Sequence, residues 1–446
     1  MSVTDWWLGQ AGINTATVVC RANTTESVTV TYDGNSFIGN ADSSVKDGVV
    51  AIPLTGVSET RKPYYVNGVY GGTLRSKKQT GPWYIASGAC WGKVKTDSLA
   101  YALKADYDLD LYIALGDFPY CGVGVTAWGE TTSDVTTSIA ASWNLPMYYA
   151  HHRQQRLLPG IKELKRNVPF VYMADDHEYP MDDARPTYLS RYQADVDPTA
   201  IQADLDVAWI AARTAITAYA TGNPVNTDPG IDSDAIYFRA TLGPLELFVC
   251  DLIHYGSPPT DADTSAKRML GSPQQTWVVD YVNSSTATFK ALIISKQFWR
   301  GGGNTDTYAA VGVNLGYQTD LKDLLWRIKD TPGVFAIAGD QHRFTDQQAA
   351  ADALGAGYPA ISCLVGSPTS VEQNASAGSG YPEYIVWRDN GPNDAPPIVS
   401  EKVVALLVVT EEKVERFFLS TKVGLISRGH IEAGSNVVKY PQMKFG

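Results

Sequence analysis

Five short apolar segments between residues 83 and 340 each end in a residue that can bind a metal ion or move a proton. Their length and their content of Val, Ile, Phe and Tyr are typical of β-strands. Helical patterns separate them, and an alternation of strands and helices favours an α/β sheet. In open α/β sheets the ligand site lies at the carboxyl ends of the strands, so we expect the end residues to converge. These end residues are Cys90, Asp117, Asp175, Asp176, His177, Asp251, Asp340 and His342.

The helical patterns have recognisable lengths and starts. Residues 200–220 are rich in Ala and carry apolar side chains at every third or fourth position, which predicts a long amphipathic helix. Ser272 and Pro273 predict the start of another helix, with Ser as the cap and Pro at the first position. Shorter helices are predicted over residues 98–104, 159–166 and 320–329.

Residues 1–78 have a different pattern, which predicts strands alone. Val28, Val30 and Tyr32 alternate with Thr residues, as in a half-buried strand. Asn67-Gly68 lies between two short apolar runs and is a strong hairpin signal. Short strands with turns at this spacing predict a small β-sandwich. The pattern changes after the Ser, Lys and Gly residues at 76–81, so we expect a second domain over 79–446.

Composition narrows the classes of function. The 446 residues include 36 Lys and Arg against 47 Asp and Glu, a net charge of −11, which argues against a nucleic-acid binder because such surfaces are basic. No apolar run reaches the roughly 18 residues that a membrane-spanning helix needs. The N-terminal sequence MSVTDWWLGQ lacks a basic region followed by an apolar stretch, so we expect no export signal in the chain as given. Compartment and oligomeric state stay open.

The five cysteines are too few, and odd in number, for a disulfide framework. Cys20, Cys250 and Cys363 lie inside apolar runs and are interpreted as small core residues. Cys90 and Cys121 lie beside polar loops. They could form a disulfide with each other, or Cys90 could be a metal-binding thiolate.

The strand ends offer thiolate, phenolate, carboxylate and imidazole groups, all of which bind metals. Thiolate and phenolate together favour a metal such as Fe(III), and the carboxylates could bridge to a harder cation such as Ca²⁺ or Mg²⁺. A cluster of several metals can generate hydroxide and hold both oxygens of an in-line displacement at phosphorus. A single Asp after a strand is more often a helix cap. The prediction therefore depends on two Gly-Asp motifs and one Asp-Asp-His motif occurring together.

The segments IASGACWG, LGDFPY, VPFVYMADDHEYPMDD, KRMLGSPQQTWVVDYV and AGDQHRF together resemble a known family. The family is that of the PhoD-like phosphatases (alkaline phosphatase D), within the calcineurin-like metallophosphoesterases, and the resemblance covers nearly the whole chain. It implies an α/β (α+β) fold, a four-layer α/β/β/α metallophosphatase sandwich over residues 79–446. Because WWLGQAGINTATVVCRA is similar to the family's N-terminal part, it also implies a fibronectin-type β-sandwich over residues 1–78.

The resemblance implies one Fe³⁺ and Ca²⁺ ions as cofactors. It implies that Asp182, near a position where the family commonly has an Asn calcium ligand, also faces a metal. His177 would be the general acid for the leaving oxygen or a hydrogen-bond donor to phosphate, and general acid catalysis contributes about 10²–10⁴-fold. By motif match the other metal ligands would be Cys90, Asp117, Tyr120, Asp176, Asp340 and His342.

One departure from the family concerns phosphate binding. Ile253 and Gly256 stand in places where the family usually has Arg, so a positive group is missing there. Arg343 is the preferred replacement, because it adjoins a predicted ligand and Arg binds phosphate through two hydrogen bonds. The other candidates are Arg185, His254 and Arg300.

We therefore expect a metal-dependent phosphoesterase that acts on phosphate monoesters, diesters or both. A metal-bound hydroxide would attack phosphorus in line, and His177 would assist the leaving alcohol. One alternative is a two-metal phosphodiesterase without iron on the same scaffold, with a divalent pair such as Mn²⁺, Zn²⁺ or Mg²⁺. The other is a surface- or particle-associated binding protein in which hydrolase activity is secondary. Metal content distinguishes the first alternative, and phosphatase activity with added Ca²⁺ and iron distinguishes the second.

Overall fold

A computed structural model describes most of the chain and includes the greater part of each predicted domain. Four predicted site residues lie outside the described residues: Tyr120, Asp182, His342 and Arg343. The described residues are 2–91, 100, 103–104, 106–119, 121, 144–181, 183–195, 197–232, 235–300, 309–310, 316–340, 345–348, 361–365, 385–388, 403–420, 424–436 and 438–439.

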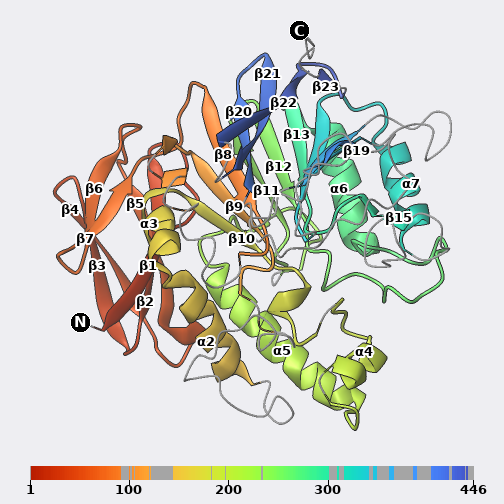
Figure 1. The fold of residues 1–446 in the computed structure, drawn as a ribbon. Coiled ribbons are helices and arrows are strands. Elements are labelled where there is room, and N and C mark those ends of the chain that lie inside the picture. The colour runs from red at the N-terminus through yellow and green to blue at the C-terminus, as the bar shows by residue number, and fades with distance from the viewer. Residues whose placement is uncertain are drawn as a thin grey trace.

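The N-terminal part of the chain forms two antiparallel sheets around one apolar core (Figure 1). Val28, Val30 and Tyr32 are buried while the residues between them are not, which is the alternation that the sequence predicts. The fibronectin type of this unit and the boundary after residue 78 stay predictions. One sheet contains β1 (Val3–Leu8), β2 (Thr15–Ala22) and β5 (Val49–Thr55), and the other contains β3 (Glu26–Tyr32), β4 (Asn35–Ala41), β6 (Lys62–Val66) and β7 (Val69–Leu74).

Two seven-stranded sheets form the centre of the remaining chain. In the first sheet, β8, β9 and β10 are parallel, and β20 pairs with β8 in the antiparallel sense. Its order is β10 (Phe170–Met173), β9 (Leu111–Leu115), β8 (Trp83–Gly88), β20 (Val403–Val409), β21 (Lys413–Ser420), β22 (Gly424–Glu432) and β23 (Val438–Lys439).

In the second sheet, β12, β13, β16 and β18 are parallel neighbours. Strands β9, β10 and β16, which precede predicted ligands, are buried along their whole length, so they are apolar throughout rather than alternating. The order is β11 (Phe238–Leu242), β12 (Leu245–Val249), β13 (Phe289–Ile293), β16 (Val334–Ala338), β18 (Ser362–Val365), β17 (Thr345–Gln348) and β19 (Ile385–Arg388).

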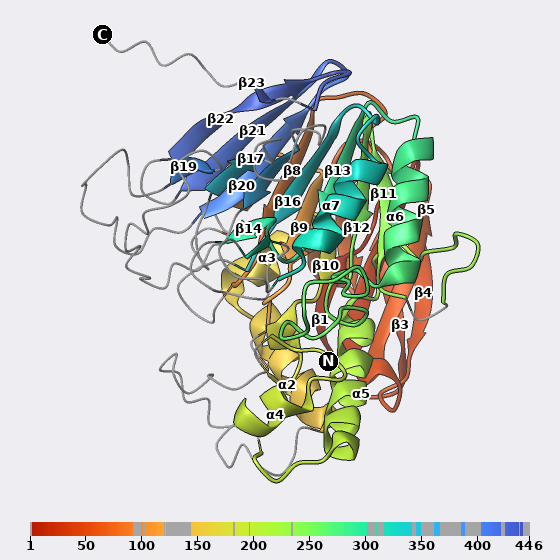
Figure 2. The same cartoon turned by 90° about the vertical axis from the view of Figure 1, so that its right-hand side faces the viewer.

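The two sheets pack face to face, and helices cover their outer faces (Figures 1 and 2). Apolar side chains of both sheets, among them Ile113 and Ile337, form the layer between them. The predicted four-layer α/β/β/α class is confirmed. The helices against the first sheet are α2 (Leu145–Arg156), α3 (Pro159–Asn167) and α5 (Gln202–Tyr219), and those against the second are α6 (Ser272–Ser284) and α7 (Gln318–Arg327).

Helix starts differ slightly from the sequence prediction. Ser272 is the first residue of α6 rather than its cap, because Gly271 before it has a φ of 70° and takes the cap position. The remaining short elements are η1 (Lys46–Gly48), η2 (Asp176–Glu178), α4 (Leu189–Asp195), β14 (Trp299–Arg300) and β15 (Ala309–Ala310).

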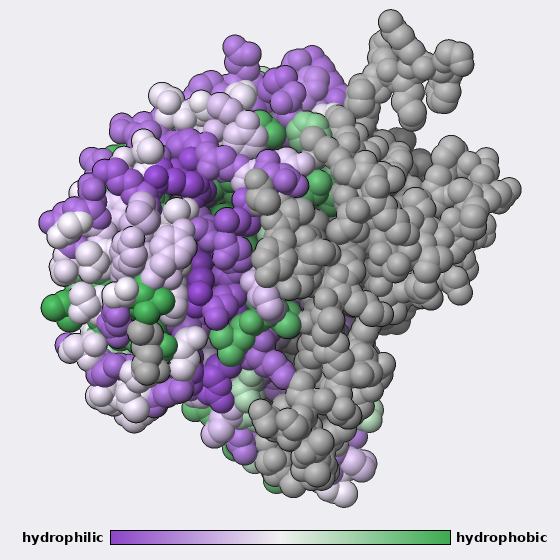
Figure 3. Space-filling view, turned by 60° about the vertical axis from the view of Figure 1, so that its left-hand side comes forward, coloured by the Kyte–Doolittle hydropathy of each residue, from purple (hydrophilic) through white to green (hydrophobic). Residues whose placement is uncertain are grey.

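Hydrophilic residues predominate on the face that Figure 3 shows, and apolar ones form small separate patches among the residues coloured there. Single exposed apolar side chains, such as Ile38 and Tyr70, are ordinary for a solvated surface. Across the part of the chain that the structure describes, no helix combines the length and the apolar character needed to cross a membrane.

Two glycines allow the strand ends to approach each other closely. Gly116, at the end of β9, has a φ of 89°, and a Cβ there would collide with Asp175 at the end of β10. A Cβ on Gly339, at the end of β16, would collide with Ala89 beyond β8. Gly339 therefore brings the end of the second sheet against the end of the first. A larger residue would not fit at either glycine position without a shift of its neighbours. Each Gly-Asp motif therefore places its Asp in the space where the two sheets meet.

Candidate metal centre

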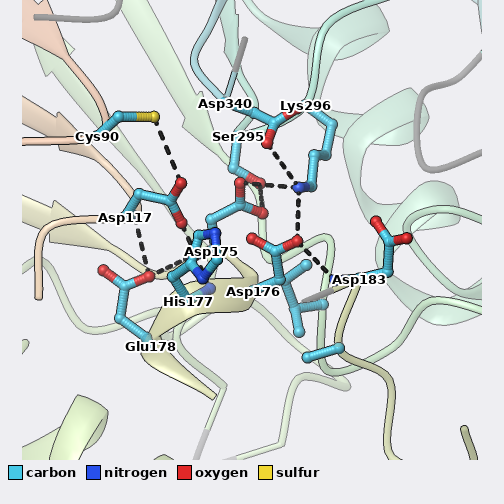
Figure 4. Close-up of polar contacts among 12 residues, drawn as sticks. Cys90, Asp117, Asp175, Asp176, His177, Glu178, Asp183, Ser295, Lys296 and Asp340 are labelled. Carbon is cyan, nitrogen blue, oxygen red and sulfur yellow. Dashed lines mark hydrogen bonds and ion pairs between the residues drawn. The ribbon is translucent and has the colours of Figure 1, made fainter. Parts of the chain in front are cut away.

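Three of the predicted ligands have left-handed backbone directly beyond strand ends. The φ angles are 57° at Cys90, 52° at Asp117 and 67° at Asp340. A residue with a side chain adopts this conformation at a cost of about 1–2 kcal/mol. Such strain persists where the surrounding structure holds it, and it concentrates at functional sites. Figure 4 shows the three side chains arriving from different strand ends around one common space.

Asp117 lies at the centre of this space and is fully buried. The Cys90 thiol donates a hydrogen bond to Asp117 Oδ2 at 3.3 Å. The backbone N–H of His177 donates to Asp117 Oδ1 at 3.4 Å (Figure 4). The ends of β8, β9 and β10 are therefore linked through one carboxylate, as the parallel order of these strands requires.

Glu178 stabilises the backbone at the ends of β9 and β10. Its buried carboxylate accepts the backbone N–H groups of Asp117 at 2.9 Å, Phe118 at 2.7 Å and Asp175 at 2.9 Å. Backbone hydrogen bonds to a carboxylate are stronger than neutral ones. Glu178 therefore offsets the strain at Asp117. The sequence analysis gave Glu178 no role, although its place directly after the Asp-Asp-His motif was the available signal.

Two overlapping groups of side chains have ligand atoms within 4.8 Å of one another. The first group contains Asp117, Asp176 and His177, and the second contains Asp117, Asp175, Asp176 and Asp340. Asp117, Asp175 and Asp176 are buried, whereas Asp340 and His177 are partly buried. Such a concentration of buried acids requires positive charge nearby, because isolated buried carboxylates are strongly unfavourable.

The pKa values of three of these carboxyl groups reflect their burial and the charges around them. Burial raises the pKa of Asp117 to about 7, with Asp176 and Asp340 adding to the shift. Burial also raises the pKa of Asp175 well above its usual range, against the opposing effect of Lys296. At Asp176 burial acts in the same direction, but Lys296 and His177 outweigh it and lower the pKa. Nearby positive charge therefore acts mainly on Asp176, and burial dominates the pKa shifts of Asp117 and Asp175.

Lys296 supplies positive charge from the end of β13, and the sequence analysis missed it. Its Nζ lies 2.9 Å from Asp176 Oδ2, 2.9 Å from Asp340 Oδ1 and 3.3 Å from Asp175 Oδ2 (Figure 4). Ser295 beside it donates a hydrogen bond to Asp175 Oδ1 at 2.8 Å. The signal was present: β13 is a further apolar strand that ends in polar residues.

The donor atoms that remain fit metal ions. Asp176 Oδ1 and Asp340 Oδ2 are buried and accept no hydrogen bond from the described residues. Buried carboxylate oxygens usually have a partner, so these two point to a cation. Carboxylate oxygens suit hard cations, and the Cys90 thiol and the His177 imidazole add softer donors. The residues present thus fit a metal-binding centre.

The structure brings Cys90, Asp117, Asp176, His177 and Asp340 together, whereas Asp251 does not join them. The ends of β8, β9, β10 and β16 meet as expected. The expectation that all five strand ends converge is wrong for β12, since Asp251 is in neither group of the described ligand atoms.

Asp251 stabilises its own loop instead. Its carboxylate accepts the backbone N–H groups of Ile253 and His254 and lies 3.5 Å from Arg213. This is the ordinary role of an Asp after a strand.

Two of the candidate phosphate-binding cations are engaged elsewhere. Arg185 is fully buried and donates hydrogen bonds to the carbonyl of Ala184 and to Tyr317. The Nδ1 atom of His254 accepts a hydrogen bond from the indole of Trp209 at 3.2 Å. The side chains of Arg300 and Arg343 lie outside the description.

None of the five cysteines forms a disulfide in the structure. A Cys90–Cys121 disulfide, one of the two sequence alternatives, is therefore not formed. Cys121 is buried, and its backbone N–H donates to the carbonyl of His177 at 2.7 Å. Cys20, Cys250 and Cys363 are buried in the apolar cores, as predicted.

Comparisons with known proteins show the family and the fold of this chain. The family model described as PhoD-like phosphatase matches residues 83–384. Alkaline phosphatase D of Bacillus subtilis (strain 168) is 26% identical over 261 residues, which are 54% of this chain and 43% of that protein. The chain thus matches less than half the length of this curated relative. The solved "Structure of PhoD" has the same fold, with a TM-score of 0.69 and 16% identity over 98% of this chain and 92% of that one.

Proposed function

Because this chain belongs to the PhoD-like phosphatase family, we propose that it is a metal-dependent phosphoesterase. The observation that carries the proposal is the buried group of Asp117, Asp175, Asp176 and Asp340 at converging strand ends, with His177 beside it. Buried carboxylates with unpartnered oxygens are what a metal centre needs and what a purely structural core avoids. Phosphate monoesters, diesters or both are the proposed substrates.

The proposed metals are Fe³⁺ and Ca²⁺, and a divalent pair such as Mn²⁺, Zn²⁺ or Mg²⁺ without iron is the alternative. When bound, such ions polarise phosphoryl oxygens and lower the pKa of water. Within the described residues, Cys90, Asp117 and Asp340 are the proposed iron ligands, with Asp117 and Asp340 also available to bridge, and Asp176 completes the cluster. Outside them, the proposed ligands are Tyr120, Asp182 and His342, and the proposed phosphate-binding cation is Arg343.

His177 is the proposed general acid. Its side chain is partly buried, as is that of Asp340, whereas Asp117, Asp175 and Asp176 are buried. Its backbone is fixed on both sides, because its N–H donates to Asp117 and its carbonyl accepts from Cys121. A fixed backbone leaves the imidazole with a narrow range of positions, which is what transfer of a proton to one leaving oxygen requires.

Substitution of Asp117 tests the proposal. We expect Asp117→Asn to lose most turnover of nitrophenyl phosphate and of bis-nitrophenyl phosphate, because the amide removes a charge shared by both ligand groups. Asp33→Asn, in an exposed ion pair on the N-terminal sheets, is the control. Unchanged turnover by a folded Asp117→Asn protein would contradict the proposed function.

The identity of the metals needs its own measurement. Fe³⁺ bound to a thiolate should colour the purified protein, and elemental analysis should find iron. Cys90→Ser should remove the thiolate part of the visible absorption while Cys250→Ser leaves it unchanged, since Cys250 lies in a different core. A colourless protein with a divalent pair would support the alternative without iron.

A further inference from the structure

Lys296 is the one fixed cation that the described residues place among the carboxylates of the proposed metal centre. Its side chain is fully buried, and its ammonium lies within 3.3 Å of three different aspartates. An ammonium has three N–H donors, and each has a carboxylate oxygen within reach. We infer that Lys296 takes the place of one metal ion, so that this centre binds one ion fewer than the same carboxylates would bind around a neutral side chain. The inference rests on the proposed function.

Lys296 is not positioned to bind substrate. A phosphate-binding lysine has to present N–H groups to solvent or to an open pocket, whereas the Lys296 side chain is 0% exposed. Its contacts are with Asp175, Asp176 and Asp340, which are themselves parts of the ligand group. The lysine therefore acts within the centre, as a permanently attached positive charge.

The oxygens of the shared carboxylates divide into two sets. Asp176 offers Oδ2 to Lys296 and to the backbone N–H of Asp183, and Asp340 offers Oδ1 to Lys296. Asp176 Oδ1 and Asp340 Oδ2 remain buried without a hydrogen bond from the described residues. Each carboxylate thus has one oxygen toward the lysine and the other available to a metal. This is the arrangement expected where an ammonium and a metal ion share bridging ligands.

Charge and desolvation explain why a lysine can replace an ion here. Lys296 cancels one of the four negative charges of Asp117, Asp175, Asp176 and Asp340. If residue 296 were neutral and of the same size, the three carboxylates that now contact it would lose their shared counter-charge, and the hydrogen bonds from Ser295 to Asp175 and from Asp183 to Asp176 would not replace it. A small divalent cation can satisfy these oxygens instead, because oxygen ligands are what Ca²⁺ and Mg²⁺ bind.

The test is a count of bound metal in Lys296→Met. Wild type and variant are stripped with chelator, dialysed against Ca²⁺ or Mn²⁺ alone, and analysed for metal per chain. We expect the variant to hold one divalent ion more than wild type. Lys290→Met is the matched control, since Lys290 is also buried and lies on β13 but donates to the carbonyl of Pro332. Its metal content should equal that of wild type.

Stability provides a second measurement that does not depend on activity. In chelator, Lys296→Met should unfold at a lower temperature than wild type, and Ca²⁺ or Mn²⁺ should raise its midpoint by more than it raises that of wild type. If the variant is recovered only by refolding with one of these ions, the inference is supported. If neither ion allows the variant to refold, the inference is overturned, because the inference requires that a metal ion can replace the ammonium of Lys296.

The remaining outcomes separate this inference from the proposed function. In the first outcome, wild type binds metal and hydrolyses phosphate esters, and folded Lys296→Met has the same metal content as wild type. This outcome would overturn the inference but not the proposed function. A wild type that binds no metal and hydrolyses no phosphate ester would overturn the proposed function, and the inference with it.

Discussion

The carboxylate of Glu178 accepts the backbone N–H of Asp117 at 2.9 Å and so fixes the predicted central metal ligand from behind. The same carboxylate accepts the N–H groups of Phe118 and Asp175. One buried side chain therefore joins the ends of β9 and β10 and holds the left-handed turn at Asp117. Metal ligands are commonly oriented by such supporting hydrogen bonds.

We expect Glu178→Gln to weaken the centre without touching it directly. Both carboxylate oxygens accept backbone N–H groups, so in either orientation the Gln amide would direct its NH₂ at a backbone donor. Unfolding should become easier by about 1–3 kcal/mol, and metal affinity should fall by about 10–100-fold. Metal titration and urea unfolding measure the two effects.

The control is Glu163→Gln, because Glu163 lies in an exposed pair with Lys104. This substitution should change neither the metal affinity nor the free energy of unfolding. Equal metal affinities of the Glu178 and Glu163 variants would contradict the role of Glu178.

We expect the effect of His177→Ala to depend on the leaving group. An alkyl alkoxide needs a proton as it departs, so turnover of an alkyl phosphate should fall by about 10²–10⁴-fold. Nitrophenolate needs no proton, and nitrophenyl phosphate should lose much less. Comparison of kcat for the two substrates measures the difference. His430→Ala, which removes a half-exposed histidine paired with Glu432, is the control. An equal loss on both substrates would show that His177 acts in some other way.

We expect Asp47→Asn to loosen the N-terminal sheets from the catalytic part. Asp47 in η1 accepts hydrogen bonds from Arg21, from Arg153 of α2 and from Tyr219 of α5. Both oxygens face cations, so an amide would direct its NH₂ at a guanidinium. The free energy of unfolding should fall by about 2–3 kcal/mol, within the range for a buried pair that loses one charge.

The control for this prediction is Asp33→Asn. Asp33 also has a left-handed backbone, with a φ of 49° against 56° at Asp47. Any effect of the substitution on backbone strain should therefore be similar at the two positions. Its pair with Lys62 is exposed and should contribute less than about 1 kcal/mol. Equal stability of the two variants in urea would show that Asp47 does not couple the two parts.

We expect acid stability to depend on Asp320, in the first turn of α7. Burial raises the pKa of Asp320 to about 6, although Met269 donates a backbone N–H to it and Arg268 lies 3.2 Å away. The unfolded chain has a lower value, about 3.9. Between these values the folded state binds more protons, so the contribution of Asp320 to stability is present below about pH 4 and is lost as pH rises through about 6.

Asp320→Asn should remove this pH dependence while keeping an acceptor for Met269. From pH 4 to pH 6 the variant should gain stability relative to wild type by about 3 kcal/mol at most, as the difference in pKa implies. Urea unfolding followed by tryptophan fluorescence at several pH values measures the difference. Parallel curves for the two proteins would contradict the prediction.

Much of the fold followed from local sequence patterns. The buried strands of a two-faced sheet have to be apolar throughout, so β8, β9, β10 and β16 were recognisable as short apolar runs. Parallel neighbours end at the same edge, which made the meeting of Cys90, Asp117 and Asp176 predictable from the strand ends alone. Asp340 follows a strand of the second sheet and joins them because the two sheets pack face to face. Helix α2 was not predicted, because its Tyr, His and Gln residues give a weak amphipathic pattern.

The sequence alone determined which side chains lie at the strand ends. Only the folded structure decided which of these side chains meet and which other residues lie between them. Asp251 ends a strand like the others but is bound within its own loop. Lys296 and Glu178 reach the centre because two sheets and a short turn enclose them. Burial and charge pairing depend on packing between segments more than 100 residues apart, as for Lys296 and Asp176. No local pattern carries that information, since a Lys or Glu after a strand is usually solvated.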